Sequence, residues 1–222
     1  MNENANQMIQ SILDMGPVMP VIVIDNAADA IPLADALLEG GLRTIEITLR
    51  TPAALGAIEA IARTGSEICI GAGTVTSAGL ARSAIDAGAK FAVSPGTTAD
   101  VIDGCADVGL PLLPGAATVS EMMSLMQAGF TAMKFFPAMA AGGPGFVKSL
   151  ASPLPQITIC PTGGITAATA PEWLALPNVR CLGGSWVAPQ KLIADGDFAT
   201  IRNLAKEAAA LKRCPHHIRS KK

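Results

Sequence analysis

Eight short apolar runs recur along this chain at nearly even intervals, and that regularity limits the folds open to it. Successive runs lie 19 to 25 residues apart, about the length that one strand and one helix require. The stretches between them are rich in Ala and Leu with helical spacing. The runs are centred at Val23, Ile45, Ile70, Val93, Leu112, Lys134, Ile159 and Leu182. Strict alternation predicts parallel strands, and eight regular units predict an α/β fold of the (β/α)8 TIM-barrel type.

A doubly wound open sheet is the alternative, but that fold carries a Gly-rich loop after its first strand. Asp25-Asn26-Ala27 follows the first run here, and the Gly-rich loops come late. We therefore expect residues 1–222 to form a single barrel domain. We expect an extra helix over residues 1–16, with an apolar stripe of Met8, Ile9, Ile12 and Met15. The basic residues 213–222 are expected to form a flexible tail.

The composition argues against several classes of partner. A net charge of -2 gives no reason to expect nucleic acid or an anionic membrane. No segment approaches the roughly 20 apolar residues of a membrane helix. No Lys or Arg precedes Arg43, so we expect no signal peptide. The five cysteines are scattered without metal-ligand spacing, which predicts free thiols in a reducing cytoplasm and no metal site.

Lys134 lies in the apolar run Ala132-Met133-Lys134-Phe135-Phe136, which is typical of a buried strand. An ammonium group is costly to remove from water. Burial therefore favours the neutral amine, which is a nucleophile toward carbonyl groups. The alternative is a lysine at a strand end whose side chain extends to solvent, and this segment alone does not decide between the two.

The second run carries polar residues on one face. Thr44, Glu46, Thr48 and Arg50 share one parity, and Ile45, Ile47 and Leu49 share the other. Side chains alternate along a strand, and the outer face of a barrel strand packs on helices. Glu46 and Lys134 are therefore predicted to point into the barrel, with Arg50 at the carboxyl rim where barrel enzymes place their active sites. The alternative is a buried Glu46–Lys134 ion pair without chemistry.

Two glycine pairs follow the last two runs, Gly163-Gly164 after the seventh and Gly183-Gly184 after the eighth. The loops after these strands are the usual phosphate site of a (β/α)8 barrel, because bare backbone N–H groups can approach an oxyanion there. A single pair predicts only a turn. Two pairs at the two expected places indicate a phosphorylated substrate.

Together these residues suggest chemistry on a phosphorylated 2-oxo acid. The Lys134 amine would form an iminium, an electron sink that lets an adjacent C–C bond break. Arg50 suits the substrate carboxylate, because its planar fork binds carboxylates in bidentate fashion. Thr74 could add a hydroxyl from the end of the third strand, and Glu46 would shuttle protons.

Two segments, Gly41–Arg50 and Gly129–Ala138, resemble the two signatures of the KDPG/KHG aldolases, the 2-dehydro-3-deoxy-phosphogluconate and 4-hydroxy-2-oxoglutarate aldolases. The resemblance runs from about Ile12 to about Leu211. It implies a class I lyase, metal-independent and homotrimeric, that releases pyruvate with glyceraldehyde 3-phosphate or glyoxylate. It further implies these roles: Lys134 forms the Schiff base, Glu46 is the acid/base, Arg50 and Thr74 hold the pyruvate carboxylate, Pro95 and Phe136 line the pocket, Thr162 faces the aldehyde-derived part, and Gly163, Gly164, Gly184 and Ser185 lie near the phosphate.

Three alternatives stay open at this point. An aldolase of the same family could act on the phosphogalactonate analogue, which differs at one stereocentre. Another phosphate-binding barrel, such as an epimerase or synthase, would give Lys134 no covalent role. A catalytically silent barrel would only bind a phosphosugar.

Overall fold

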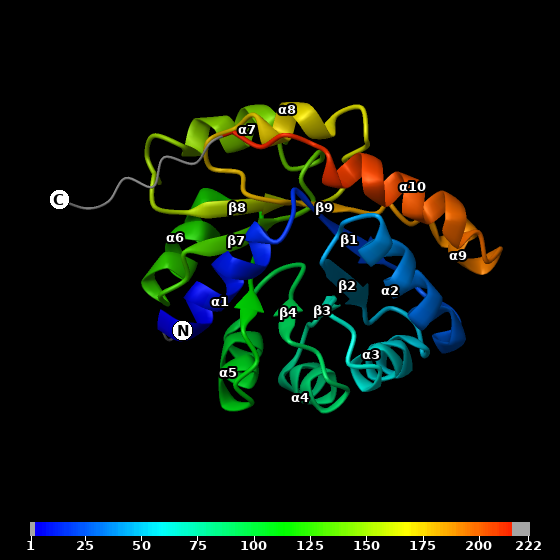
Figure 1. Cartoon of the computed structure of the whole chain (residues 1–222). Helices are drawn as coiled ribbons and strands as arrows, with labels where there is room; N and C mark the ends of the chain where they lie inside the picture. Colours follow the sequence, from blue (N-terminus) through cyan, green and yellow to red (C-terminus); the bar gives the residue numbers. More distant parts are fainter. Residues whose placement is uncertain (1–2, 215–222) are drawn as a thin grey trace.

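The computed structural model describes residues 3–214, and strands and helices alternate along them (Figure 1). The strands are β1 (Val18–Ile22), β2 (Thr44–Thr48), β3 (Cys69–Gly73), β4 (Phe91–Val93), β5 (Leu112–Leu113), β6 (Gly115–Ala116), β7 (Ala132–Phe135), β8 (Thr158–Pro161) and β9 (Leu182–Gly184). The helices are α1 (Glu3–Asp14), η1 (Ala27–Asp29, a 3-10 turn), α2 (Ala30–Glu39), α3 (Ala54–Arg63), α4 (Ala78–Asp86), α5 (Ala99–Asp107), α6 (Val119–Gln127), α7 (Gly143–Leu150), α8 (Ala170–Leu174), α9 (Gln190–Ala194) and α10 (Phe198–Ala209). Each predicted apolar run overlaps a strand.

The strands form a curled parallel sheet within an α/β fold. Six of them pair in the order β5-β4-β3-β2-β1-β9, and three more in the order β6-β7-β8. All the strand pairs are parallel, as the strand–helix alternation predicts. Two isolated parallel bridges, Ile159↔Val179 and Thr162↔Gly183, connect the β8 side to the β9 side. Pro114 separates β5 in the fifth run from β6 just after it, because proline has no N–H for a ladder hydrogen bond.

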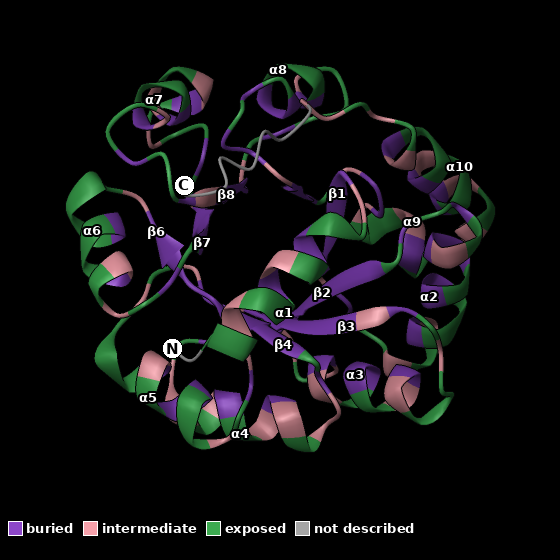
Figure 2. Cartoon of the chain, turned by 60° about the vertical axis from the view of Figure 1, so that its left-hand side comes forward, coloured by how far each residue is buried: buried purple, intermediate pink, exposed green. Residues whose placement is uncertain are grey.

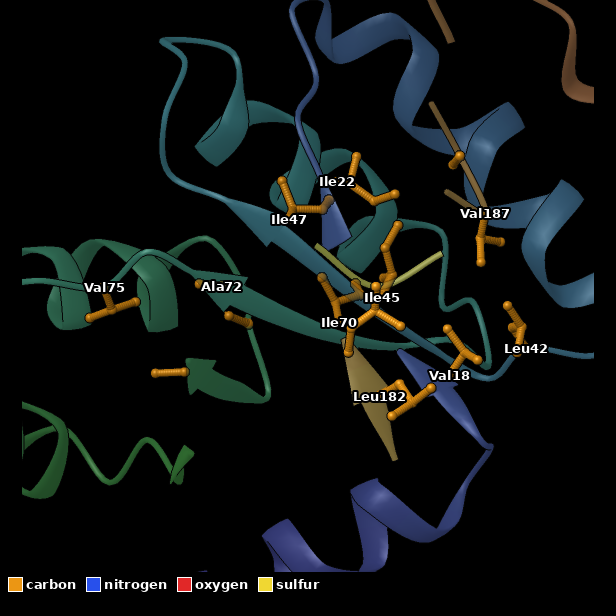
Figure 3. Packing of buried hydrophobic residues seen from close by; sticks show 14 of the residues in the cluster. Val18, Ile22, Leu42, Ile45, Ile47, Ile70, Ala72, Val75, Leu182 and Val187 are labelled. Atoms are coloured by element: carbon orange, nitrogen blue, oxygen red, sulfur yellow. The ribbon is translucent and has the colours of Figure 1, made fainter. Parts of the chain in front are cut away.

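The core has an outer layer between strands and helices. Figure 3 shows Ile45 and Ile47 of β2 beside Ile22 of β1 and Ile70 of β3. These side chains belong to one cluster with buried residues of the surrounding helices, and Figure 2 shows the exposed helix faces turned outward. The aliphatic residues of β2, Ile45 and Ile47, therefore face the helices. The alternate residues, Glu46 among them, face the interior of the sheet.

The inner layer is small and α1 covers it. Ile9, Ile12 and Leu13 of α1 are buried against inward-facing residues of several strands. The predicted stripe was wrong for Met8 and Met15, whose exposures are 49% and 40%, because the helix buries the face that Leu13 shares with Ile9 and Ile12. None of the helices within residues 3–214 is both long and apolar enough to cross a membrane. Most of the predicted basic tail, residues 215–222, lies outside the described residues.

Candidate active site

Lys134 on β7 and Glu46 on β2 meet in the interior. Lys134 Nζ lies 3.1 Å from Glu46 Oε1, and the two residues are only 3% and 1% exposed. The Lys134 side chain therefore does not extend to solvent. Its Nζ also lies 5.5 Å from the centroid of the Phe136 ring. Strand parity predicted that both side chains point inward, and the structure places them within hydrogen-bonding distance.

Glycines on β3 make room for this pair. A Cβ on Gly73 would lie 2.3 Å from Glu46 Oε1 and 2.7 Å from Glu46 Cγ, and one on Gly71 would lie 2.2 Å from the Phe91 ring. Contacts this close mean that a larger residue at Gly73 would force Glu46 to move, and one at Gly71 would force Phe91 to move. Gly73 was not among the site residues predicted from the sequence. The signal was present, because two glycines at alternate positions inside a strand indicate close approach on one face.

Arg50 and Thr74 form a second group at the carboxyl ends of β2 and β3. Arg50 Nε donates to Thr74 Oγ1 over 3.1 Å. Thr74 has a φ of 60°, and it is the only non-glycine residue with positive φ among residues 3–214. A β-branched residue is rarely found in this left-handed region. The conformation turns the chain as it leaves β3 and brings the hydroxyl to the guanidinium, so a cation and a hydroxyl donor stand together at the rim.

The glycine loops form a third group, at the ends of β8 and β9. A Cβ on Gly183 would lie 2.1 Å from Thr162 Oγ1, and this buried hydroxyl has no hydrogen-bond partner within the described part of the chain. Gly163 and Gly164 have φ values of 103° and 76°, which glycine adopts at no steric cost. Ser185 follows Gly184 directly in the other loop and is exposed. The loops thus place glycine backbone and the hydroxyls of Thr162 and Ser185 at the carboxyl ends of two strands.

The remaining predicted residues lie at neighbouring strand ends. Pro95 follows β4 and Phe136 follows β7, and both are half-buried. The Cβ position of Gly163 is 3.3 Å from the Phe136 ring, so that ring lies between Lys134 and the loop after β8. The predicted residues other than Glu46 and Lys134 therefore lie at or just beyond the carboxyl ends of strands, while Glu46 and Lys134 point into the interior from within β2 and β7. Within residues 3–214, no group of three or more His, Cys, Asp and Glu side chains could hold a metal ion.

Comparisons with known proteins identify the family of this chain. The family model for KDPG and KHG aldolase matches residues 9–204. The 2-dehydro-3-deoxy-phosphogluconate aldolase of Pseudoalteromonas atlantica is 47% identical over 210 residues, covering 95% of this chain and 98% of the relative. The KHG/KDPG aldolase of Escherichia coli K12 is 44% identical, covering 93% of this chain and 97% of the relative.

Two solved structures are similar along almost the whole chain. One is a KDPG aldolase from Legionella pneumophila with pyruvate captured as a covalent carbinolamine intermediate, with a TM-score of 0.88 and 42% identity, covering 90% of this chain and 98% of that one. The other is the 2-keto-3-deoxy-6-phosphogluconate aldolase of Zymomonas mobilis with 3-phosphoglycerate, with a TM-score of 0.88 and 45% identity, covering 95% and 99%. With a family model over most of its length and such relatives, this chain belongs to the KDPG and KHG aldolase family.

Proposed function

We propose that this chain is a class I aldolase that cleaves 2-dehydro-3-deoxy-6-phosphogluconate to pyruvate and glyceraldehyde 3-phosphate. The observation that carries the proposal is the buried Lys134 Nζ, 3.1 Å from Glu46 Oε1, in a chain whose relatives are named KDPG aldolases. A buried amine beside a carboxylate has both a nucleophile and a proton acceptor within reach of one substrate carbon.

The proposed reaction needs no group beyond these side chains. The neutral Lys134 amine adds to the C2 carbonyl, and the carbinolamine loses water to give an iminium. Glu46, directly or through a water, removes the proton of the C4 hydroxyl, and the C3–C4 bonding electrons move to the iminium. The aldehyde leaves, the resulting enamine takes a proton at C3, and hydrolysis releases pyruvate. The carbinolamine captured in the Legionella relative supports the first step.

The surrounding residues suit the two ends of this substrate. Arg50 and Thr74 offer a cation and a hydroxyl for the pyruvate carboxylate, with Pro95 and Phe136 as pocket walls. Thr162 would face the aldehyde-derived part, since its buried hydroxyl has a free hydrogen-bonding capacity. The phosphate would lie on the last two loops, at Gly163, Gly164, Gly184 and Ser185. The 3-phosphoglycerate bound by the Zymomonas relative is consistent with a phosphorylated three-carbon fragment.

A second activity, cleavage of 4-hydroxy-2-oxoglutarate to pyruvate and glyoxylate, is favoured by the name of the Escherichia coli relative, a KHG/KDPG aldolase at 44% identity. The phosphogalactonate analogue is less well supported, because the KDPGal structure is 28% identical with a TM-score of 0.70. Assays with all three substrates rank them directly.

We also propose that residues 1–222 form one (β/α)8 barrel with α1 as an extra N-terminal helix, assembled as a homotrimer in the cytoplasm without a metal cofactor. Closure of the barrel is supported by the bridges between β8 and β9 and by the adjacency of β5 and β6 in the chain. Exposed apolar side chains such as Val119, Met123 and Met139 supply surface for an interface. Sedimentation equilibrium should give three times the 22.6 kDa chain mass, and a monomer mass would contradict the trimer.

The experiment that tests the reaction is borohydride reduction in the presence of pyruvate, followed by peptide mass mapping. We expect irreversible labelling at Lys134 in the wild-type protein and none in Lys134→Ala. The matched control is Lys148→Ala, which removes an exposed lysine of α7 and should label normally. No adduct in wild-type protein under saturating pyruvate would refute the proposal.

A further inference from the structure

A closed ring of hydrogen bonds joins the end of β4 to β6. The Gly115 N–H donates to Ser94 Oγ over 3.1 Å, and Thr97 Oγ1 donates to the Gly115 carbonyl oxygen over 2.9 Å. The two hydroxyl oxygens lie 3.1 Å apart. A hydroxyl has one hydrogen to donate, and that of Thr97 is used on the carbonyl. The Ser94 hydroxyl must therefore donate to Thr97 Oγ1, which gives each donor of the ring one acceptor.

This ring lies where the backbone ladder of the sheet is interrupted. β4 pairs with β5 and β6 pairs with β7, but Pro114 separates β5 from β6 and has no N–H to donate. The side chains of Ser94 and Thr97 thus supply hydrogen bonds across the seam between the six-stranded and the three-stranded sheets.

The packing around the ring leaves little freedom. Ser94 is 0% exposed. A Cβ on Gly115 would lie 2.4 Å from the carbonyl carbon of Pro95 and 2.5 Å from the carbonyl oxygen of Ser94. The β4 end therefore rests directly on the Gly115 backbone. Removing the Ser94 hydroxyl would leave the buried Gly115 N–H without its acceptor, and buried backbone groups are seldom left unpaired.

Gly115 in turn lies against the strand of the proposed nucleophile. It is in register with Lys134 on β7, and the Lys134 N–H donates to the carbonyl of the preceding residue, Pro114, over 2.8 Å. We infer that Ser94 and Thr97 are positioning residues for Lys134, acting through Gly115. This inference rests on the proposed aldolase function. A displacement of Gly115 would be transmitted to Lys134, and a misplacement of about 1 Å in a reacting group can cost about 10²-fold in rate.

The test is a graded series of variants assayed for kcat and for the rate of borohydride-trappable imine formation with pyruvate. Ser94→Ala removes the acceptor of the Gly115 N–H and should lower both rates about tenfold. Thr97→Val removes the bond to the Gly115 carbonyl and the acceptor of the Ser94 hydroxyl, but it leaves Ser94 Oγ in place for the Gly115 N–H, so it should lower both rates only about two- to threefold. Thr97→Ser keeps the hydroxyl and should restore wild-type rates. Thr98→Val is the matched control, because Thr98 is exposed and its side chain makes no capping hydrogen bond.

A positioning role predicts that kcat falls while KM stays nearly constant. A loss of stability alone would not produce this difference between the two constants. In Thr97→Val, KM for 2-dehydro-3-deoxy-6-phosphogluconate should change less than about twofold, because residue 97 is not among the proposed substrate contacts and the proposed phosphate loops follow β8 and β9 on other strands. Wild-type rates per folded molecule in Ser94→Ala would overturn the inference. If Ser94→Ala does not fold, equal kcat in Thr97→Val and Thr97→Ser overturns it instead. Failure of the proposed function is distinct, since wild-type protein itself would then form no adduct.

Discussion

Replacing Gly73 with alanine should disable the proposed acid/base, Glu46, although neither Glu46 nor Lys134 is itself substituted. The added Cβ would stand 2.3 Å from Glu46 Oε1, 2.7 Å from Cγ and 2.8 Å from Cδ. Because Cγ is also too close, rotating the carboxylate about its last bond does not relieve the contact. The whole Glu46 side chain has to move within a buried interior.

The size of the effect follows from these distances. Ordinary contact begins near 3.4 Å, so Glu46 Oε1 must retreat by about 1 Å. Its distance of 3.1 Å to Lys134 Nζ leaves little room before the hydrogen bond is lost. Displacement of this order costs about 10²-fold in rate, whereas overpacking by one methyl costs about 1–3 kcal/mol in the free energy of unfolding. We therefore expect Gly73→Ala to fold and to lose about 10²-fold in kcat.

The assay follows pyruvate release with lactate dehydrogenase and NADH, alongside thermal unfolding. Gly145→Ala is the matched control, because a Cβ at this exposed position of α7 meets nothing within 4 Å and alanine should stabilise the helix by about 0.5–1 kcal/mol. Its kcat should equal that of the wild type. A Gly73→Ala variant with wild-type kcat would refute the reasoning, since Glu46 would then work from another position.

Three further predictions concern single residues. Glu46→Gln should slow turnover by about 10²-fold or more while borohydride still traps some imine, and normal turnover would remove Glu46 from the mechanism. Ser185→Ala should raise KM for the phosphorylated substrate and leave KM for 4-hydroxy-2-oxoglutarate unchanged, so an equal rise for both would contradict a phosphate contact. Hydrogen bonds from the backbone N–H groups of Ala117 and Thr118 lower the pKa of Glu121 below its ordinary 4.5. Thr118 and Glu121 form a capping box at the start of α6, in which each side chain accepts from the backbone N–H of the other residue. The stability from this capping box is therefore present above pH 4.5 and lost as pH falls through the folded pKa, so the Tm difference between wild type and Glu121→Gln should shrink from pH 6 to pH 3. A constant difference would contradict this prediction.

Periodicity and parity were sufficient to predict the strands and the Lys134–Glu46 contact. A strand in a parallel sheet is buried on both faces, so each appears as an apolar run whatever its neighbours. Parity then assigns every side chain to one of two faces. A polar side chain that points inward from an apolar strand shares the enclosed interior with the inward-pointing side chains of the other strands. Glu46 and Lys134 could therefore be expected to meet. The capping box at Thr118 is equally local, since its partners lie within four residues.

Features that depend on register could not be predicted in this way. The clash between a Gly73 side chain and Glu46 exists only because β2 and β3 pair with Thr48 opposite Gly73. The ring around Gly115 likewise requires the end of β4 to reach β6 past Pro114. The left-handed φ of Thr74 contradicts the preference of its residue type. Parity does not fix inter-strand offsets of this kind, because a shift of two residues leaves every side chain on the same face.

The buried pair also bears on why this chain keeps two charges in its interior. Desolvating an ammonium and a carboxylate costs several kcal/mol per ion, and replacing such a pair with apolar residues is often neutral or stabilising. Beneath α1 the interior is filled by a cluster of buried apolar side chains, so the fold does pack hydrocarbon where no chemistry is proposed. Gly73 further gives up side-chain packing to leave space beside Glu46. Stability alone would favour larger apolar side chains in all these places. The arrangement is accounted for if Lys134 must lose and regain a proton beside a carboxylate that bulk water does not reach.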